Sequence, residues 1–124
     1  MNVAKKILLV DDDSRNIFAL KAVLKARGYY CETAGSADDG IEQLNNDPEI
    51  GIVLMDMMMP DMDGYEAIAN IRANPETAGI PVIAVTAQAM IGDKERCLTA
   101  GANGYISKPV DVDLLLELLK TYLK

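Results

Sequence analysis

The chain has 124 residues, half of them hydrophobic and a quarter charged, a composition typical of a single soluble globular domain. It carries 12 lysines and arginines against 19 aspartates and glutamates, which gives a formal net charge of −7. This acidic balance argues against binding to nucleic acid or to an anionic membrane, because both partners require basic patches. Neither a signal-peptide pattern nor an apolar run long enough to span a bilayer is present, so we expect a cytoplasmic protein.

Histidine is absent from the chain, and this restricts the chemistry that it can perform. Serine–histidine catalysis, histidine-ligated zinc and a phosphohistidine within the chain are all excluded. Cys31 and Cys97 lie in apolar surroundings without metal-ligand spacing, so we expect buried free thiols in a reducing compartment. Any chemistry must therefore use carboxylates, lysine, hydroxyl groups or a bound metal.

The first third of the chain predicts two strands, each followed by a helix. The apolar run Lys6–Val10 stops at three aspartates and is typical of a strand buried on both faces. Ser14 is expected to cap a helix that Gly28 ends. A second strand is predicted at Tyr29–Thr33, and Ser36 begins a capping pattern before the next helix.

The remaining elements follow the same alternation. Three further strands are predicted at Ile50–Met55, Pro81–Val85 and Gly104–Ser107. A turn over Pro60–Gly64 leads to one helix, a second helix covers roughly 91–100, and Asp111 is expected to cap the last helix.

Five strand–helix pairs predict an α/β fold with a parallel sheet covered by helices on both faces. Right-handed crossovers restrict the topology, and the commonest arrangement at this size is the flavodoxin-like strand order 2-1-3-4-5. We expect residues 1–124 to form one domain with no output domain.

Polar residues follow the carboxyl ends of the predicted strands, where open α/β sheets form their sites. Asp11, Asp12 and Asp56 follow the first and third strands, which are neighbours in this order, while Thr86 and Lys108 follow the fourth and fifth. Carboxylates that meet in one crevice raise each other's pKa, and a hard cation relieves this repulsion. Mg²⁺, with Mn²⁺ as a possible substitute, suits such oxygen ligands and commonly serves phosphate chemistry.

The same residues could accept a phosphoryl group. A carboxylate is ionised at neutral pH, so it can attack phosphorus without a general base, as a chain without histidine requires. The metal and Lys108 would neutralise the phosphoryl oxygens, and the Thr86 hydroxyl could hydrogen-bond one of them.

Four stretches, KILLVDDD, IVLMDMMMPDMDGYEAI, IPVIAVTA and GANGYISKP, occur in this order along nearly the whole chain. In sequence and spacing they resemble the CheY-like receiver domain of two-component response regulators. The resemblance fits a single-domain regulator and the receiver of a hybrid histidine kinase equally well. It implies a phosphoacceptor that works in phosphorelay signalling and turns over no separate substrate.

The resemblance also implies roles in the pocket. Asp56 would be the phosphoacceptor and Lys108 would pair with the phosphoryl group. Asp12 would be a direct Mg²⁺ ligand, with Asp11 acting through water. The backbone carbonyl of Met58 would complete the protein ligands of the metal, together with Asp56.

Further residues are implied to carry the switch. Thr86 would swing toward the phosphoryl oxygens and the rotamer of Tyr105 would follow it. Pro109 is expected to follow a cis peptide bond. Met58 and Gln88, each two residues past a pocket residue, would tune the phosphate lifetime.

The expected partners are proteins. The phosphoryl donor would be a histidine kinase or a histidine phosphotransfer protein, docking near the first helix and Pro109. A downstream target would read the face formed by helix 91–100, strand 104–107 and the last helix, with Met90 and Ile91 as contact residues.

Three other classes remain as alternatives. A receiver-like module could bind or dimerise without phosphate, although a complete acid pocket argues against this. A small-substrate aspartyl-phosphate hydrolase normally needs a carboxylate where Met58 stands, and three aspartates would repel a flavin phosphate. Structural roles also remain open, with Asp56 as a loop cap, Asp13 at the helix start and Tyr105 as packing.

Overall fold

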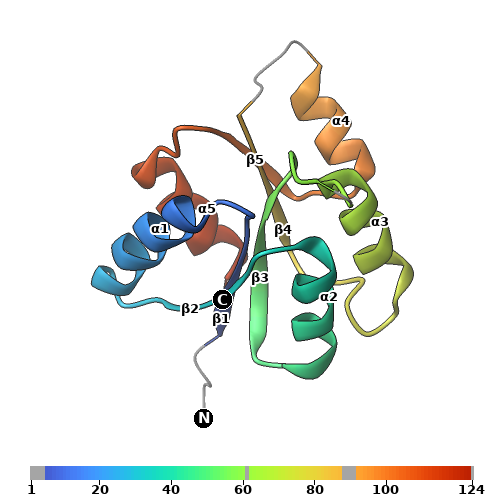
Figure 1. Cartoon of the computed structure of the whole chain (residues 1–124), viewed down its shortest axis with the longest axis horizontal. Coiled ribbons are helices and arrows are strands. Elements are labelled where there is room, and N and C mark those ends of the chain that lie inside the picture. The colour runs from blue at the N-terminus through green and yellow to red at the C-terminus, as the bar shows by residue number, and fades with distance from the viewer. Residues whose placement is uncertain (1–4, 61, 88–91, 124) are drawn as a thin grey trace.

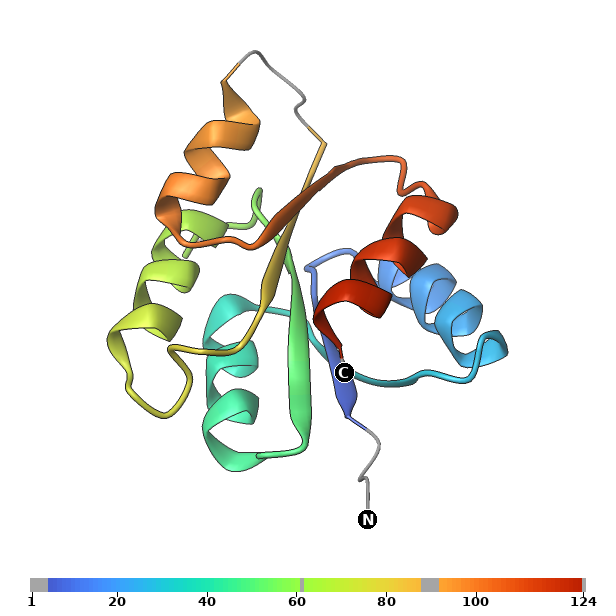
Figure 2. The ribbon, with the colours of Figure 1, turned by 180° about the vertical axis from the view of Figure 1, so that it is seen from behind.

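Five parallel strands form one sheet in the order β2-β1-β3-β4-β5 in a computed structural model that describes residues 5–60, 62–87 and 92–123 (Figures 1 and 2). The strands are β1 (Lys6–Val10), β2 (Tyr30–Ala34), β3 (Ile50–Asp56), β4 (Val82–Thr86) and β5 (Gly104–Ser107). The helices are α1 (Ser14–Ala26), α2 (Ala37–Asn46), α3 (Gly64–Ala73), α4 (Asp93–Ala100) and α5 (Val112–Tyr122). The predicted fold class and strand order are confirmed.

The helices cover both faces of the sheet, with α1 and α5 on one face and α2, α3 and α4 on the other (Figure 1). Side chains alternate along each strand, so every central strand contributes to two separate cores. Leu8 and Met55 point into the core under α2, α3 and α4, whereas Leu9 and Leu54 point into the core under α1 and α5. This burial on both faces explains the continuous apolar runs of β1, β3 and β4.

Acceptor side chains begin four of the helices. Ser36 and Asp111 cap α2 and α5 as predicted, and Asp63 caps α3. The predicted cap Ser14 was wrong for α1, whose cap is Asp13, with its side chain accepting from the Arg15 amide at 2.9 Å. This agrees with the alternative that placed Asp13 at the helix start. Ser14 is instead the first helical residue. A carboxylate in this position also interacts favourably with the positive end of the helix dipole.

Several element boundaries differ by one or two residues from those predicted. The strand β3 extends one residue further, because Asp56 pairs with Val85. The strand β4 also ends one residue later, because Thr86 pairs with Ser107 of β5. The phosphoacceptor candidate is therefore the last residue of a strand. The α4 helix begins at Asp93, and the preceding residues 88–91 lie outside the described part of the chain.

Both cysteines are buried free thiols, as expected. Cys31 packs in the core under α1 and α5, and Cys97 packs in the core on the other face. Burial raises the pKa of the Cys31 thiol to about 11, which keeps it protonated at neutral pH. None of the helices in the described residues is both long and apolar enough to cross a bilayer.

Candidate functional site

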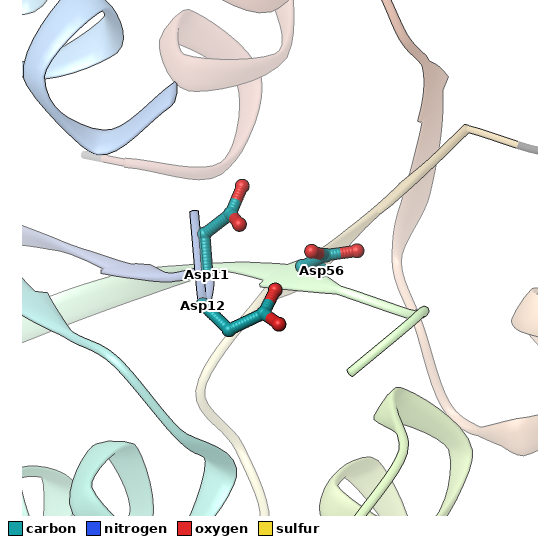
Figure 3. Close-up of side chains that lie close together, drawn as sticks. All are labelled: Asp11, Asp12 and Asp56. Carbon is teal, nitrogen blue, oxygen red and sulfur yellow. The ribbon is translucent and has the colours of Figure 1, made fainter. Parts of the chain in front are cut away.

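Three aspartates meet at the carboxyl end of the sheet. Asp11 and Asp12 directly follow β1, and Asp56 ends the neighbouring strand β3. One carboxylate oxygen from each lies within 4.8 Å of the others, and Figure 3 shows the Asp12 side chain directed toward Asp56. Asp11 and Asp56 are buried, at 7% and 4% exposed, whereas Asp12 is open to solvent. The predicted convergence of these three carboxylates is therefore present.

Lys108 enters the same cluster from the end of β5. Its Nζ atom lies 3.2 Å from Asp11 Oδ2 and 3.3 Å from Asp56 Oδ2. The Lys108 amide donates to the Thr86 carbonyl at 2.7 Å, which ties the lysine to the end of β4. The bond from Lys108 to Pro109 is cis, as expected. One ammonium group thus bridges two buried carboxylates.

Backbone amides fix the second oxygen of each buried carboxylate. The Met58 amide donates to Asp56 Oδ1 at 3.0 Å, and the Asp13 amide donates to Asp11 Oδ1 at 2.8 Å. Each carboxylate is therefore held by one amide and by Lys108. This bonding orients the Asp56 side chain before any ligand arrives.

The charges in the cluster perturb one another. Burial raises the pKa of Asp56 above its ordinary value, and the negative charge of Asp11 raises it further. The Met58 amide and Lys108 oppose this effect without cancelling it. Burial alone would lower the pKa of Lys108, but the charges of Asp56 and Asp11 outweigh it, so the net pKa is raised. The cluster has more negative charge than Lys108 neutralises.

Thr86 and Tyr105 lie on the same side of the sheet. Thr86 is buried at the end of β4, and Tyr105 on β5 pairs in register with Ala84, two residues earlier than Thr86. Residues two apart on a strand project from the same face, so both side chains face α4. Tyr105 is half-buried against the core there.

The family follows from a comparison with known proteins. A family model described as the response regulator receiver domain matches residues 7–120. The chain belongs to this family. It is a receiver domain of two-component signalling.

Relatives of this receiver domain occur in proteins of different sizes. The sensor histidine kinase RcsC of Salmonella typhimurium strain LT2 is 42% identical over 118 residues, which cover 94% of this chain and 12% of that kinase. The polar-differentiation response regulator DivK of Brucella ovis is 34% identical, with 98% of each chain covered. This chain therefore spans about an eighth of that kinase and 98% of the small regulator.

A solved structure gives the same fold. The receiver domain of the sensor histidine kinase PA1611 of Pseudomonas aeruginosa has a TM-score of 0.87 and 33% identity, with 98% of each chain covered. That receiver domain has a magnesium ion coordinated in its active site cleft.

The acidic cluster of this receiver domain has the chemistry of a magnesium site. Mg²⁺ prefers a few carboxylate oxygens and retained waters, and the three aspartates offer such oxygens within 4.8 Å of one another. Burial and then the charge of Asp11 raise the pKa of Asp56, and a bound cation would favour the ionised carboxylate against both effects. Met58 follows two residues after Asp56, so its backbone carbonyl belongs to the same loop.

Three predicted residues lie outside the described part of the receiver domain: Gln88, Met90 and Ile91. Their proposed roles in phosphate lifetime and partner contact stay predictions.

A groove lies beside the acidic cluster, in the region of the first helix and Pro109 where donor docking was predicted, although the groove itself was not predicted. It has a volume of about 240 Å³ and runs between α1 and the segment that follows β5, with Asp11 and Lys108 among its lining residues. The other lining residues are Asn16, Ala19, Leu20, Val23, Pro109, Val110 and Val112. The spacing of Leu20 and Val23 marks an apolar stripe on α1, but the groove also requires the path of the chain after Pro109.

Proposed function

We propose that this receiver domain accepts a phosphoryl group on Asp56 from a phosphohistidine of a partner protein, in a Mg²⁺-dependent step. One observation carries the proposal, which is the bridge of Lys108 Nζ to Asp56 and Asp11 at 3.3 and 3.2 Å beside Asp12. A lysine and an acidic cluster around one oriented carboxylate suit phosphoryl transfer, which depends mainly on positioning and charge neutralisation.

The bond changes are those of a displacement at phosphorus. An oxygen of the ionised Asp56 carboxylate attacks phosphorus and forms a P–O bond. The P–N bond to the donor imidazole breaks, and its electron pair leaves with the imidazole. The product is an acyl phosphate on Asp56, and no proton needs to be removed from the nucleophile.

The metal would be held by Asp56, Asp12 and the backbone carbonyl of Met58, with Asp11 acting through water. When bound, Mg²⁺ or Mn²⁺ supplies positive charge that neutralises the phosphoryl oxygens. Lys108 contributes the second positive charge, and its present contacts with Asp56 and Asp11 position it at the acceptor oxygen.

The switch would follow from the added charge and oxygen atoms. A phosphorylated carboxylate gains about one further negative charge and new acceptor oxygens. The Thr86 hydroxyl moves to one of these oxygens, and Tyr105, on the same face of the sheet, occupies the space that Thr86 leaves. The surface formed by α4, β5 and α5 then favours its partner-binding conformation.

The donor would dock on the groove between α1 and the segment after Pro109. This groove opens beside Asp11 and Lys108, so a histidine side chain placed there lies close to Asp56. Phe18 on α1 is 77% exposed and offers an apolar contact outside the groove. A histidine kinase or a phosphotransfer protein in the cytoplasm supplies the histidine that this chain lacks.

The chain would catalyse only its own phosphorylation and dephosphorylation, so we propose no turnover of a separate substrate.

Intact-mass spectrometry after incubation with Mg²⁺ and a small acyl phosphate tests the proposed phosphorylation of Asp56. We expect one phosphoryl group on the native chain and none after metal chelation or in Asp56→Asn. Failure with both an acyl phosphate and a phosphorylated kinase domain would favour a binding module that works without phosphate.

A further inference from the structure

Met58 differs from the methionines around it in its exposure to solvent. Half of its surface is open, whereas Met55, Met57 and Met59 are 0%, 1% and 8% exposed. Thioethers oxidise to sulfoxides when an oxidant can reach them, so exposure selects among neighbouring methionines. In the described part of this run, Met58 is the methionine that an oxidant in solution reaches most readily.

Met58 also lies at the acceptor carboxylate. Its amide donates to Asp56 Oδ1 at 3.0 Å. The Cα atom is one bond of about 1.5 Å further, so the side chain begins within about 4.5 Å of that oxygen. An unbranched side chain of this length can extend over the position where a phosphoryl group on Asp56 would lie.

We propose that Met58 is an oxidation site, and that its sulfoxide shortens the lifetime of phosphorylated Asp56. This inference rests on the proposed function of Asp56. The thioether sulfur gives two electrons to a peroxide and takes one of its oxygen atoms. The peroxide O–O bond breaks, and the second oxygen leaves as water. Sulfoxide reductases reverse such a change, so the modification can act as a switch.

The physical effect follows from the hydrogen-bonding capacity of the side chain. A thioether is a weak acceptor and leaves the water beside the phosphoryl group without a fixed orientation. The sulfoxide oxygen is polar and can accept a hydrogen bond from that water. A water molecule held close to phosphorus attacks faster, because less orientational freedom is lost on the way to the transition state.

The exposure of Met58 separates this effect from damage to the fold. Oxidation of the buried Met57 would insert a polar group into the core and lower the free energy of unfolding. Oxidation of the exposed Met58 should leave the urea-unfolding midpoint nearly unchanged. A changed phosphate lifetime at an unchanged midpoint therefore indicates a local effect.

The experiment begins with the untreated native chain, which is phosphorylated with a small acyl phosphate and Mg²⁺. The donor is then removed, and the loss of the phosphoryl group is followed by intact mass. The same measurement is made after mild hydrogen peroxide treatment, with peptide mass spectrometry locating each added oxygen. Met58→Leu removes the candidate thioether, Met62→Leu removes a half-buried neighbour, and Met58→Gln places an amide oxygen at the position.

We expect added oxygen on Met58 and a lifetime at least about three-fold shorter after treatment. Met62→Leu should show the same shortening as the native chain. In Met58→Leu, the phosphate lifetime should be the same before and after peroxide treatment. Met58→Gln should show a shortened lifetime without any oxidant.

Two results would overturn the inference alone: oxygen added at other methionines while Met58 stays unmodified, or an unchanged lifetime in chains oxidised at Met58. Absence of phosphoryl uptake by the untreated chain, also with a kinase donor, would overturn the proposed function and this inference with it. Phosphoryl uptake by the untreated native chain therefore distinguishes failure of the proposed function from failure of the Met58 inference.

Discussion

Lys108 Nζ lies 3.3 Å from Asp56 Oδ2, although the two residues are 52 positions apart in the chain. The contact arises because β3 and β5 flank β4 and all three strands end at the same edge of the sheet. A parallel sheet thus places a lysine and a carboxylate from distant segments in one cluster. In the proposed function, this lysine would neutralise charge that develops on Asp56 during phosphoryl transfer.

In metal-free buffer at neutral pH, Asp56→Asn should be more stable to unfolding than the native chain. The pKa of Asp56 is raised by burial, so the folded state holds this proton more tightly than the unfolded state does. Below the ordinary carboxyl pKa, Asp56 is protonated in both the folded and the unfolded state. The native chain then loses no stability relative to the variant. As the pH rises through the folded pKa, the native chain loses stability that the variant keeps.

Urea unfolding from acid to neutral pH in the presence of a chelator measures this difference. Mg²⁺ should reduce the difference in unfolding free energy between the variant and the native chain, because the metal stabilises a folded chain that retains all three carboxylates. A native chain more stable than Asp56→Asn in metal-free neutral buffer would contradict the account of the cluster.

Gly64→Ala should destabilise the chain by about 1–3 kcal/mol, because the added methyl group would overlap the loop after Asp56. A Cβ atom there would lie 2.6 Å from Met57 Cα and would also contact Met57 Sδ. Gly79→Ala is the matched control, since a Cβ atom at Gly79 meets nothing within 4 Å. Chemical unfolding of both variants tests the prediction, and equal stabilities would show that Met57 has room to move.

Arg72→Lys should lower the free energy of unfolding by about 1–3 kcal/mol, although it keeps the charge. The guanidinium donates to the carbonyls of Ala78, Ile80 and Gly101, at distances from 2.6 to 3.0 Å, and to Asn103 Oδ1 at 2.9 Å. An ammonium group cannot reach all of these acceptors. The exposed Arg27→Lys serves as control in the same urea titration, and equal losses at both positions would refute the bridging role.

Tyr65 and Arg96 should be energetically coupled by about 0.5–1 kcal/mol. The Arg96 guanidinium carbon lies 4.2 Å from the centre of the Tyr65 ring, and the contact joins α3 to α4. A double-mutant cycle with Tyr65→Leu and Arg96→Met measures the coupling. Additive losses would show that the stacked arrangement contributes nothing to the position of α4.

The fold and the acidic cluster could be predicted because they depend on local patterns. Buried strands are apolar on both faces, so their ends are visible as the first charged residue, as at Asp11 and Asp56. The strand order then brings β1 and β3 together without further information. The contact of Lys108 with Asp11 was harder to predict from the sequence, because it depends on where a loop places a flexible side chain.

Three other features could not be predicted from the sequence. One depends on two neighbouring residues that could both cap a helix, and the others depend on contacts between distant segments. Asp13 and Ser14 are both good helix caps, and the sequence alone did not decide between them. The acceptors of Arg72 are mainly backbone carbonyls, which leave no mark in the sequence. The groove beside Lys108 likewise requires the relative placement of α1 and the chain after Pro109.

Transfer from a phosphohistidine donor shows whether Asp56 accepts the phosphoryl group. A radiolabelled histidine kinase or phosphotransfer domain would be mixed with the native chain, Asp56→Asn and Asp63→Asn, each with and without Mg²⁺. Asp63 is an exposed helix cap, and asparagine caps equally well, so this variant carries the same substitution away from the cluster. We expect label on the native chain and on Asp63→Asn only with Mg²⁺, and none on Asp56→Asn. Equal labelling of Asp56→Asn would show that another residue accepts the phosphoryl group.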